Sequence, residues 1–368
     1  MTAELTIAKG TCFPVFAYEV AQAIDLDAAE RRLLAGAERQ TIKQKRRAPA
    51  YFEYRPAPLR VARDGATHVL DGYRTAPGVE VVLYDFGAVS VSYAISIEGP
   101  FGGLPALAYD LWGNEGLLAD SRRHVEALVH TLGDAAVQPR IADFVEDYSI
   151  FQIEAFTGPC EAAGLWTAHA HTVAQILRAE PHALSLQEIS DATALRLSFG
   201  PNDAAIIDTD ATLLFDPEGD DVRAVMEFAN TQLLEMRFLD QRLDDTLDRA
   251  YETLVRRPVR LAALGQWGPD LRRLARLQLD SAILFEQVTN ALKLVGDQYL
   301  ARVYALASSR FHLADWDASI TRKLQTVDGI YAKMADRAAS RRMELLEWII
   351  IVLIALSIVL SAVTLTPH

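Results

Sequence analysis

Few residues of this chain have the types and spacing that chemistry requires. His169 and His171 are two positions apart, which on a helix turns their side chains about 200° from each other, whereas helical metal ligands need i, i+3 or i, i+4 spacing. Asp208-Thr209-Asp210 resembles a DxD metal site, but aspartates in this arrangement are typical of a tight turn. The carboxylates of residues 216–221 fit a loop and a helix cap better than a calcium loop.

The sequence has no Gly-rich phosphate loop, no nucleophile elbow and no zinc spacing. Cys12 and Cys160 lie far apart and follow no ligand pattern, which is typical of packing cysteines in a reducing compartment. We therefore predict no metal, no cofactor, no small-molecule substrate and no set of catalytic residues. An enzyme whose pocket lies between sheet and helices stays open as an alternative.

One basic segment could contact a polyanion. Lys43, Lys45, Arg46 and Arg47 precede the aromatic-rich stretch 51–55, and basic residues beside aromatic ones can hold phosphates and stack on bases. Anionic lipid headgroups are a second possible contact, and a solvated loop between helix and strand is the third. The net charge of −13 means that the rest of the chain repels nucleic acid.

The C-terminal stretch is uncharged from Trp348 to Leu365, and about eighteen residues at roughly 1.5 Å each match the thickness of a bilayer. This predicts a transmembrane anchor at residues 348–365, with the lipid bilayer as a partner. The anchor residues are Trp348, Ile349, Ile350, Ile351, Leu353, Ile354, Leu356, Ile358 and Leu360. The basic residues Lys333, Arg337, Arg341 and Arg342 lie before it, so the positive-inside rule predicts a single-pass inner-membrane protein with its bulk in the cytoplasm.

Long helices are predicted upstream of that stretch. Apolar residues recur at steps of three and four over 221–257, a heptad that only Asp240 interrupts, and similar stripes follow over about 270–311 and from Asp315 onward. Such stripes predict an antiparallel bundle or coiled-coil stalk, and self-association through the same faces is the alternative. The residues predicted to pack the helices are Leu233, Leu243, Leu247, Gly296, Tyr299, Trp316, Leu324 and Tyr331.

The first part of the chain predicts an α+β fold. Residues 79–97 are rich in β-branched and aromatic residues around the turn at 85–87, which predicts a hairpin, and residues 204–215 predict a shorter one. The order of strands and helices suggests a ferredoxin-like antiparallel sheet. The length of 368 residues favours several units, which we predict at 1–160 (sheet domain), 161–220 (helical connector with short hairpin), 221–347 (long-helix bundle) and 348–365 (anchor).

Several of these segments occur together in one known family. Tyr84-Asp-Phe-Gly-Ala-Val89, the acidic helical middle and Leu346-Glu-Trp-Ile-Ile-Ile351 together resemble the DUF155 family, also described as "required for meiotic nuclear division". The stretch 293–304 resembles a bacterial branch of it. The resemblance implies an α+β domain, long helices and a C-terminal membrane helix, and it implies no catalytic residues. Eukaryotic relatives are linked to mitochondrial translation.

These observations predict a non-catalytic, tail-anchored scaffold or adaptor that can form homo-oligomers. The alternative is a membrane tether that contacts RNA or the ribosome through residues 43–47.

Overall fold

A computed structural model describes residues 5–33, 37–39, 57–70, 72–256 and 298–364. Within it the chain forms two compact units: residues 1–238 with 284–317, and residues 239–283 with 318–368. We call them the sheet unit and the helical unit.

The sheet unit is built on one large mixed sheet that has eleven strands among the described residues. Its main order is β13-β14-β15-β12-β1-β8-β7-β4-β3, and β9 and β10 also pair with β1. The strands are β1 (Thr6–Glu19), β3 (Ala37–Arg39), β4 (Leu59–Arg63), β7 (Val79–Leu83), β8 (Ala88–Ser92), β9 (Ile95–Ser96), β10 (Gly99–Pro100), β12 (Val145–Phe156), β13 (Arg196–Leu197), β14 (Ala204–Ile207) and β15 (Ala211–Phe215). Two small sheets pair β2 (Ala23–Ile24) with β11 (Ala136–Val137) and β5 (Val69–Leu70) with β6 (Tyr73–Arg74).

Strand β1 organises this sheet. It pairs antiparallel with β12 on one side and, on the other, with β8 through residues 15–19 and with β9 through residues 11–12. Pro14 lies between these two pairings, where a residue without an N–H costs the ladder no hydrogen bond.

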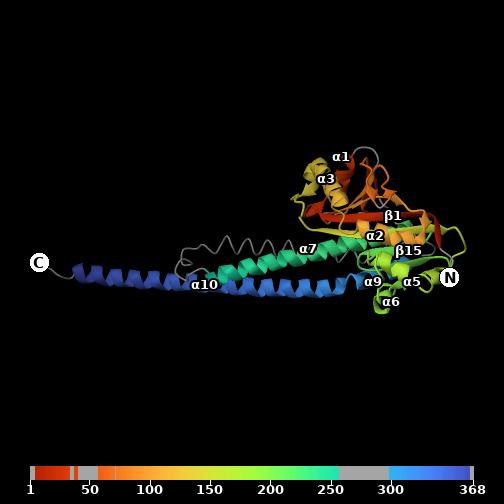
Figure 1. The fold of residues 1–368 in the computed structure, drawn as a ribbon. Helices are drawn as coiled ribbons and strands as arrows, with labels where there is room; N and C mark the ends of the chain where they lie inside the picture. Colours follow the sequence, from red (N-terminus) through yellow and green to blue (C-terminus); the bar gives the residue numbers. More distant parts are fainter. Residues whose placement is uncertain (1–4, 34–36, 40–56, 71, 257–297, 365–368) are drawn as a thin grey trace. The chain divides into compact units, whose positions relative to one another are not determined.

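Both faces of the sheet are buried. The side chains of Phe16, Phe151 and Leu213 belong to one core, whereas those of their neighbours Val15, Ile150 and Leu214 belong to another. This alternation is the two-residue period of a strand, with apolar side chains on both sides. Figure 1 shows α3 and the beginning of α7 on opposite sides of β1.

The helices are α1 (Leu26–Arg32), α2 (Leu104–Leu111), α3 (Glu115–Leu132), α4 (Ala162–Leu165), α5 (Ala170–Leu177), α6 (Leu186–Ala192), α7 (Asp220–Arg256), α9 (Gln298–Arg310) and α10 (Leu313–Thr364), with short 3-10 turns at Phe101–Gly103 and Gly133–Ala135. Their caps follow the sequence: the Asn114 side chain accepts a hydrogen bond from the Leu117 N–H at the start of α3, and Gly133 follows its end with a φ of 50°.

The two predicted hairpins are confirmed, since β7 pairs with β8 and β14 with β15. The prediction of a ferredoxin-like antiparallel sheet is wrong, because the sheet is mixed: β15 lies parallel to β12. A parallel pair needs a long crossover, and the chain from 157 to 210, with α4, α5 and α6, provides it.

The predicted C-terminal transmembrane helix is also wrong. Among the described residues, no helix combines the length and the apolar character needed to cross a membrane. The single-pass inner-membrane location and the lipid partner, which rested on this helix, lose their support. In the structure Trp348, Ile349, Ile350, Ile351, Leu353, Ile354, Leu356 and Ile358 are exposed side chains.

Candidate functional site

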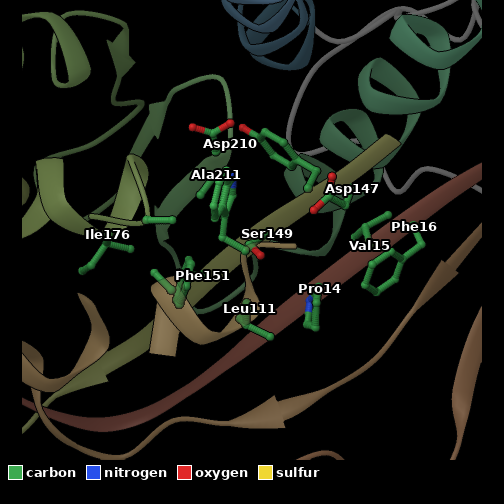
Figure 2. A pocket seen from close by; sticks show the side chains of 14 residues that line it. Pro14, Val15, Phe16, Leu111, Asp147, Ser149, Phe151, Ile176, Asp210 and Ala211 are labelled. Carbon is green, nitrogen blue, oxygen red and sulfur yellow. The ribbon is translucent and has the colours of Figure 1, made fainter. Parts of the chain in front are cut away.

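A pocket opens in the sheet unit between the sheet and helices α2 and α5 (Figure 2). Its lining comes from β1, β12, β15 and these two helices: Pro14, Val15, Phe16, Ala108, Leu111, Trp112, Asp147, Tyr148, Ser149, Phe151, Ile176, Ala179, Asp210 and Ala211. Most of these residues are apolar, and the ionisable groups are the carboxylates of Asp147 and Asp210 and the phenol of Tyr148. We call this site the acidic pocket.

The strand register brings the polar residues of the acidic pocket together. Phe16 lies opposite Asp147 and Pro14 opposite Ser149 in the antiparallel β1–β12 pair, while Ser149 is the register partner of Ala211 in the parallel β12–β15 pair. The Ser149 N–H donates to the Asp210 carbonyl at 3.1 Å. Figure 2 shows Asp147 and Asp210 toward one end of the pocket and Leu111 and Phe151 toward the other.

The electrostatics of the pocket favour a cation. Burial raises the pKa of Asp210 above its usual value, and the carboxylates of Asp208 and Asp147 raise it further, against the hydrogen bond from Thr209 and the positive charge of Arg178, which lower it. A cation that entered would relieve this repulsion and lower the pKa again. The acidic pocket is therefore suited to a positively charged group.

An exposed aromatic side chain lines the pocket at the end of α2. Trp112 is 64% exposed. A large exposed indole is common at binding sites, because it offers apolar area and can hold a cation against its face.

A buried ion network supports the turn that carries Asp210. The carboxylate of Asp208 is fully buried, its Oδ2 lies 2.9 Å from Arg178 Nε, and its Oδ1 accepts a hydrogen bond from Arg310 Nε at 2.5 Å. Asp191 contacts both guanidiniums, at 2.5 Å from Arg178 and 3.0 Å from Arg310. On the other side the Tyr148 hydroxyl donates to the Asp208 carbonyl at 2.9 Å. The β14–β15 turn is thus held from α5, α6 and α9 at once.

The size of the acidic pocket limits its ligand. Its volume is about 40 Å³. This is room for about three water molecules, or a head group of three or four heavy atoms, and far below the roughly 300–1,000 Å³ of sites for drug-sized ligands.

Turn chemistry explains Asp208-Thr209-Asp210 only in part. The Thr209 N–H donates to Asp208 Oδ1 at 2.7 Å, as a turn aspartate predicts. However, Asp208 is also the centre of the ion network and Asp210 lines the pocket. Local sequence could not reveal this, because Arg178, Asp191 and Arg310 lie 17 to 102 residues away.

The two histidines occupy separate environments. His169 precedes α5 with its ring centroid 6.0 Å from that of Phe101, and His171 is exposed on the first turn of α5. Over the part of the chain that the structure describes, no group of three or more His, Cys, Asp or Glu could hold a metal ion.

The aspartates of α7 have two kinds of partner. Asp245 pairs with Arg249 one turn away on the same helix, whereas Asp240 and Asp244 lie 2.8 and 2.7 Å from Nζ of Lys323 on α10. The residue that interrupts the heptad is therefore a partner for a lysine on another helix.

The remaining predicted residues lie as follows. Leu243 and Tyr299 are buried, and Leu233, Leu247, Trp316 and Leu324 are half-buried. Lys333 is exposed, and the side chains of Tyr331, Arg337, Arg341, Arg342 and Leu360 lie outside the described residues, as does Gly296. The basic patch Lys43, Lys45, Arg46 and Arg47 also lies outside them, so its contact with RNA, the ribosome or lipid stays a prediction.

The fold and the pocket define a mixed α/β protein with an additional unit of long helices and a small acidic pocket. Residues 9–221, more than half of the chain, match the family described as "Uncharacterized protein MJ0711, N-terminal domain", and the chain belongs to this family. The chain is similar to that protein of Methanocaldococcus jannaschii, with 22% identity over 220 residues, which cover 59% of this chain and 66% of the relative. No solved structure matches the chain. The relative is archaeal, and nothing in the match supports the bacterial branch.

Proposed function

We propose that this protein is a non-catalytic adaptor that holds a positively charged side chain of a partner protein in the acidic pocket. The observation that carries the proposal is that two carboxylates, those of Asp147 and Asp210, line one pocket together with the exposed indole of Trp112. Carboxylates pair with an ammonium or guanidinium group, and an indole face holds the same group by a cation–π contact.

Size and charge support a side chain rather than a free cofactor. About 40 Å³ admits the head of an arginine or lysine but not a nucleotide. Trp112 then supplies apolar area for the residues around that head, as aromatic side chains do in protein interfaces. The net charge of −13 steers basic partners toward the chain.

Capture of partners from extracts of the native host tests this function. The full chain is compared with Asp210→Asn, Trp112→Ala and the control Asp143→Asn, which removes an exposed carboxylate outside the pocket lining. We expect the two pocket variants to lose the same protein that the control retains, and free arginine amide to compete for it. Equal capture by all variants would overturn the proposal.

A second candidate function is an enzyme acting on a small amine. It rests on the placement of Asp147 and Asp210 in one pocket between the sheet and helices α2 and α5, and burial raises the pKa of Asp210, the direction that a general acid requires. This candidate predicts that small amines such as agmatine are converted by the full chain and left intact by Asp210→Asn, as followed by NMR. Binding without conversion would exclude conversion of the amines tested and favour the adaptor.

We also infer that the chain is related to the DUF155 family. The string Tyr84-Asp-Phe-Gly-Ala-Val89 forms the β7–β8 turn, and a Cβ at Gly87, whose φ is 105°, would overlap the Ala21 carbonyl oxygen, so this part of the shared pattern has a structural reason. A DUF155 structure in which this string does not form a hairpin turn would contradict the inference.

A further inference from the structure

A second cluster of ionisable side chains lies around Asp120 on α3, apart from the lining of the acidic pocket. The carboxylate of Asp120 accepts hydrogen bonds from the Tyr93 hydroxyl at 2.9 Å and from Arg123 Nη2 at 2.7 Å. The Nε2 atoms of His68 and His124 lie 3.1 and 3.5 Å from its Oδ2. Three segments therefore meet at one carboxylate: the loop before β5, α3 and the end of β8.

A fourth basic group completes the cluster. Arg63, at the end of β4, reaches the His124 carbonyl through Nη1 at 3.5 Å. The cluster then has three basic side chains, His68, Arg123 and His124, beside the carboxylate of Asp120, and a fourth, Arg63, at the backbone of His124, in a chain whose net charge is −13. We call it the basic cluster.

We propose that the basic cluster binds a small phosphate-class oxyanion. Two guanidiniums and two imidazoles provide the N–H donors that suit tetrahedral oxyanions. Arg123 is 71% exposed and His68 23% exposed, so a small ion can reach them from solvent, whereas Asp120 is 7% exposed.

Asp120 acts as a positioning residue in this site. Burial would raise its pKa, but the Tyr93 hydrogen bond and the contacts from His68 and His124 outweigh burial and hold the pKa below its usual value. The ionised carboxylate draws Nε2 of both rings toward itself, which leaves Nδ1 of each imidazole for a ligand.

This arrangement makes binding depend on pH. Burial lowers the pKa of His124, and the positive charges of Arg63 and Arg123 lower it further, against the attraction of Asp120. His124 is therefore neutral near neutral pH, and its Nδ1 becomes a donor only as the solution turns acidic. Since a bound anion favours the protonated ring, affinity should rise as pH falls.

The test is a titration of the full chain with sulfate, whose charge is constant over this pH range, and with inorganic phosphate, at fixed ionic strength. Histidine ring signals are followed by NMR at about pH 8 and about pH 5, where Asp120 is still ionised. We expect His68 and His124 signals to shift and the affinity for sulfate to rise about tenfold at the lower pH, the effect of one added charge-assisted hydrogen bond.

The matched variants are Arg123→Gln and Arg122→Gln. Arg122 is the adjacent arginine on α3 but pairs with Glu126 and Asp143. Arg123→Gln should weaken binding about tenfold, and Arg122→Gln should leave it unchanged. Equal losses in both variants, or an affinity for sulfate that does not change with pH, would overturn the proposal.

A third titration, with glycerol phosphate, identifies the source of the oxyanion. Tighter binding than that of inorganic phosphate indicates a phosphate ester, and equal or weaker binding indicates the free ion.

Discussion

The carboxylate of Asp208 is fully buried, and its Oδ2 lies 2.9 Å from Nε of Arg178. Removing one partner of such a pair leaves an uncompensated charge in a medium of low dielectric constant. This contact therefore ties the β14–β15 turn, and with it Asp210, to the end of α5.

We predict that Asp208→Asn lowers the free energy of unfolding of the sheet unit by about 3–5 kcal/mol, because Arg178 and Arg310 then lose their buried counter-charge. Urea denaturation of the full chain, followed by circular dichroism, measures it. Asp210→Asn is the matched control two residues away. Burial raises the pKa of both carboxyl groups, but in the part of the chain that the structure describes only Asp208 has guanidinium partners within ion-pair distance, so we expect Asp210→Asn to cost less than about 1 kcal/mol. Similar losses in both variants would show that the ion network is not what stabilises the turn.

The turn between β7 and β8 should tolerate no side chain at position 87. The Cβ of Gly87→Ala would overlap the carbonyl oxygen of Ala21, and its φ of 105° is unfavourable for any L-residue, so we predict a loss of more than about 3 kcal/mol. Gly72→Ala is the control, since its φ is 82° but no atom lies within 4 Å of the added Cβ. It should lose about 1–2 kcal/mol from the backbone alone. Thermal unfolding compares the two, and an equal effect would mean that the contact with Ala21 is unimportant.

Glu146 should make stability depend on pH. Burial raises its pKa from 4.5 to about 7, although its ion pair with Arg237 opposes the shift. Because the folded state holds the proton more tightly, the contribution of Glu146 to stability is greatest below about pH 4.5 and is lost as the pH rises through about 7.

Glu146→Gln removes this titration. The difference in unfolding free energy, wild type minus variant, should fall by about 2–3 kcal/mol between about pH 5 and about pH 8. Urea denaturation at several pH values measures it, and parallel curves for the two proteins would contradict the assignment.

In the helical unit, the contribution of Lys323 to stability should come from its ion pair with Asp240. Asp240 is 15% exposed and Lys323 21% exposed, so Lys323→Leu leaves a largely buried carboxylate without its cation, and we predict a loss of about 1–3 kcal/mol. The double variant Asp240→Leu/Lys323→Leu restores an apolar heptad position and should recover most of the loss. Thermal unfolding, followed by the helical circular dichroism signal, compares the stabilities of the single and double variants with that of the wild type. A double variant no more stable than the single one would contradict this account.

The hairpins and α7 were predictable because their signals are local. The turn residues 85–87 and the apolar alternation around them predict the β7–β8 pairing without any distant contact, and the heptad predicts α7 to within a residue or two. The parallel pairing of β12 with β15 was not predictable in this way, because it depends on the crossover through residues 157–210.

Of the candidate site, only the turn at residues 208–210 was predictable from the sequence. Asp208-Thr209-Asp210 indicated a tight turn, but the position of Asp210 beside Asp147 follows from strand register across the sheet. The basic cluster was missed for a related reason: Asp120 and His124 are four residues apart on α3, but His68 lies 52 residues earlier in the chain, and only tertiary structure brings it to them. The apolar end of α10 shows the opposite error, since composition alone was taken as evidence of a membrane span.

The most direct test of the adaptor hypothesis is a titration of the full chain with N-acetyl-arginine amide, followed by the NMR signal of the Trp112 indole. We predict a dissociation constant in the millimolar range, about 4 kcal/mol of binding energy, which weakens about tenfold in Asp210→Asn and is unchanged in Asp143→Asn. N-acetyl-glutamine amide, similar in shape but neutral, should not shift the signal. If both amides shift it equally, or if Asp210→Asn binds arginine amide as the wild type does, the acidic pocket does not hold a cationic side chain.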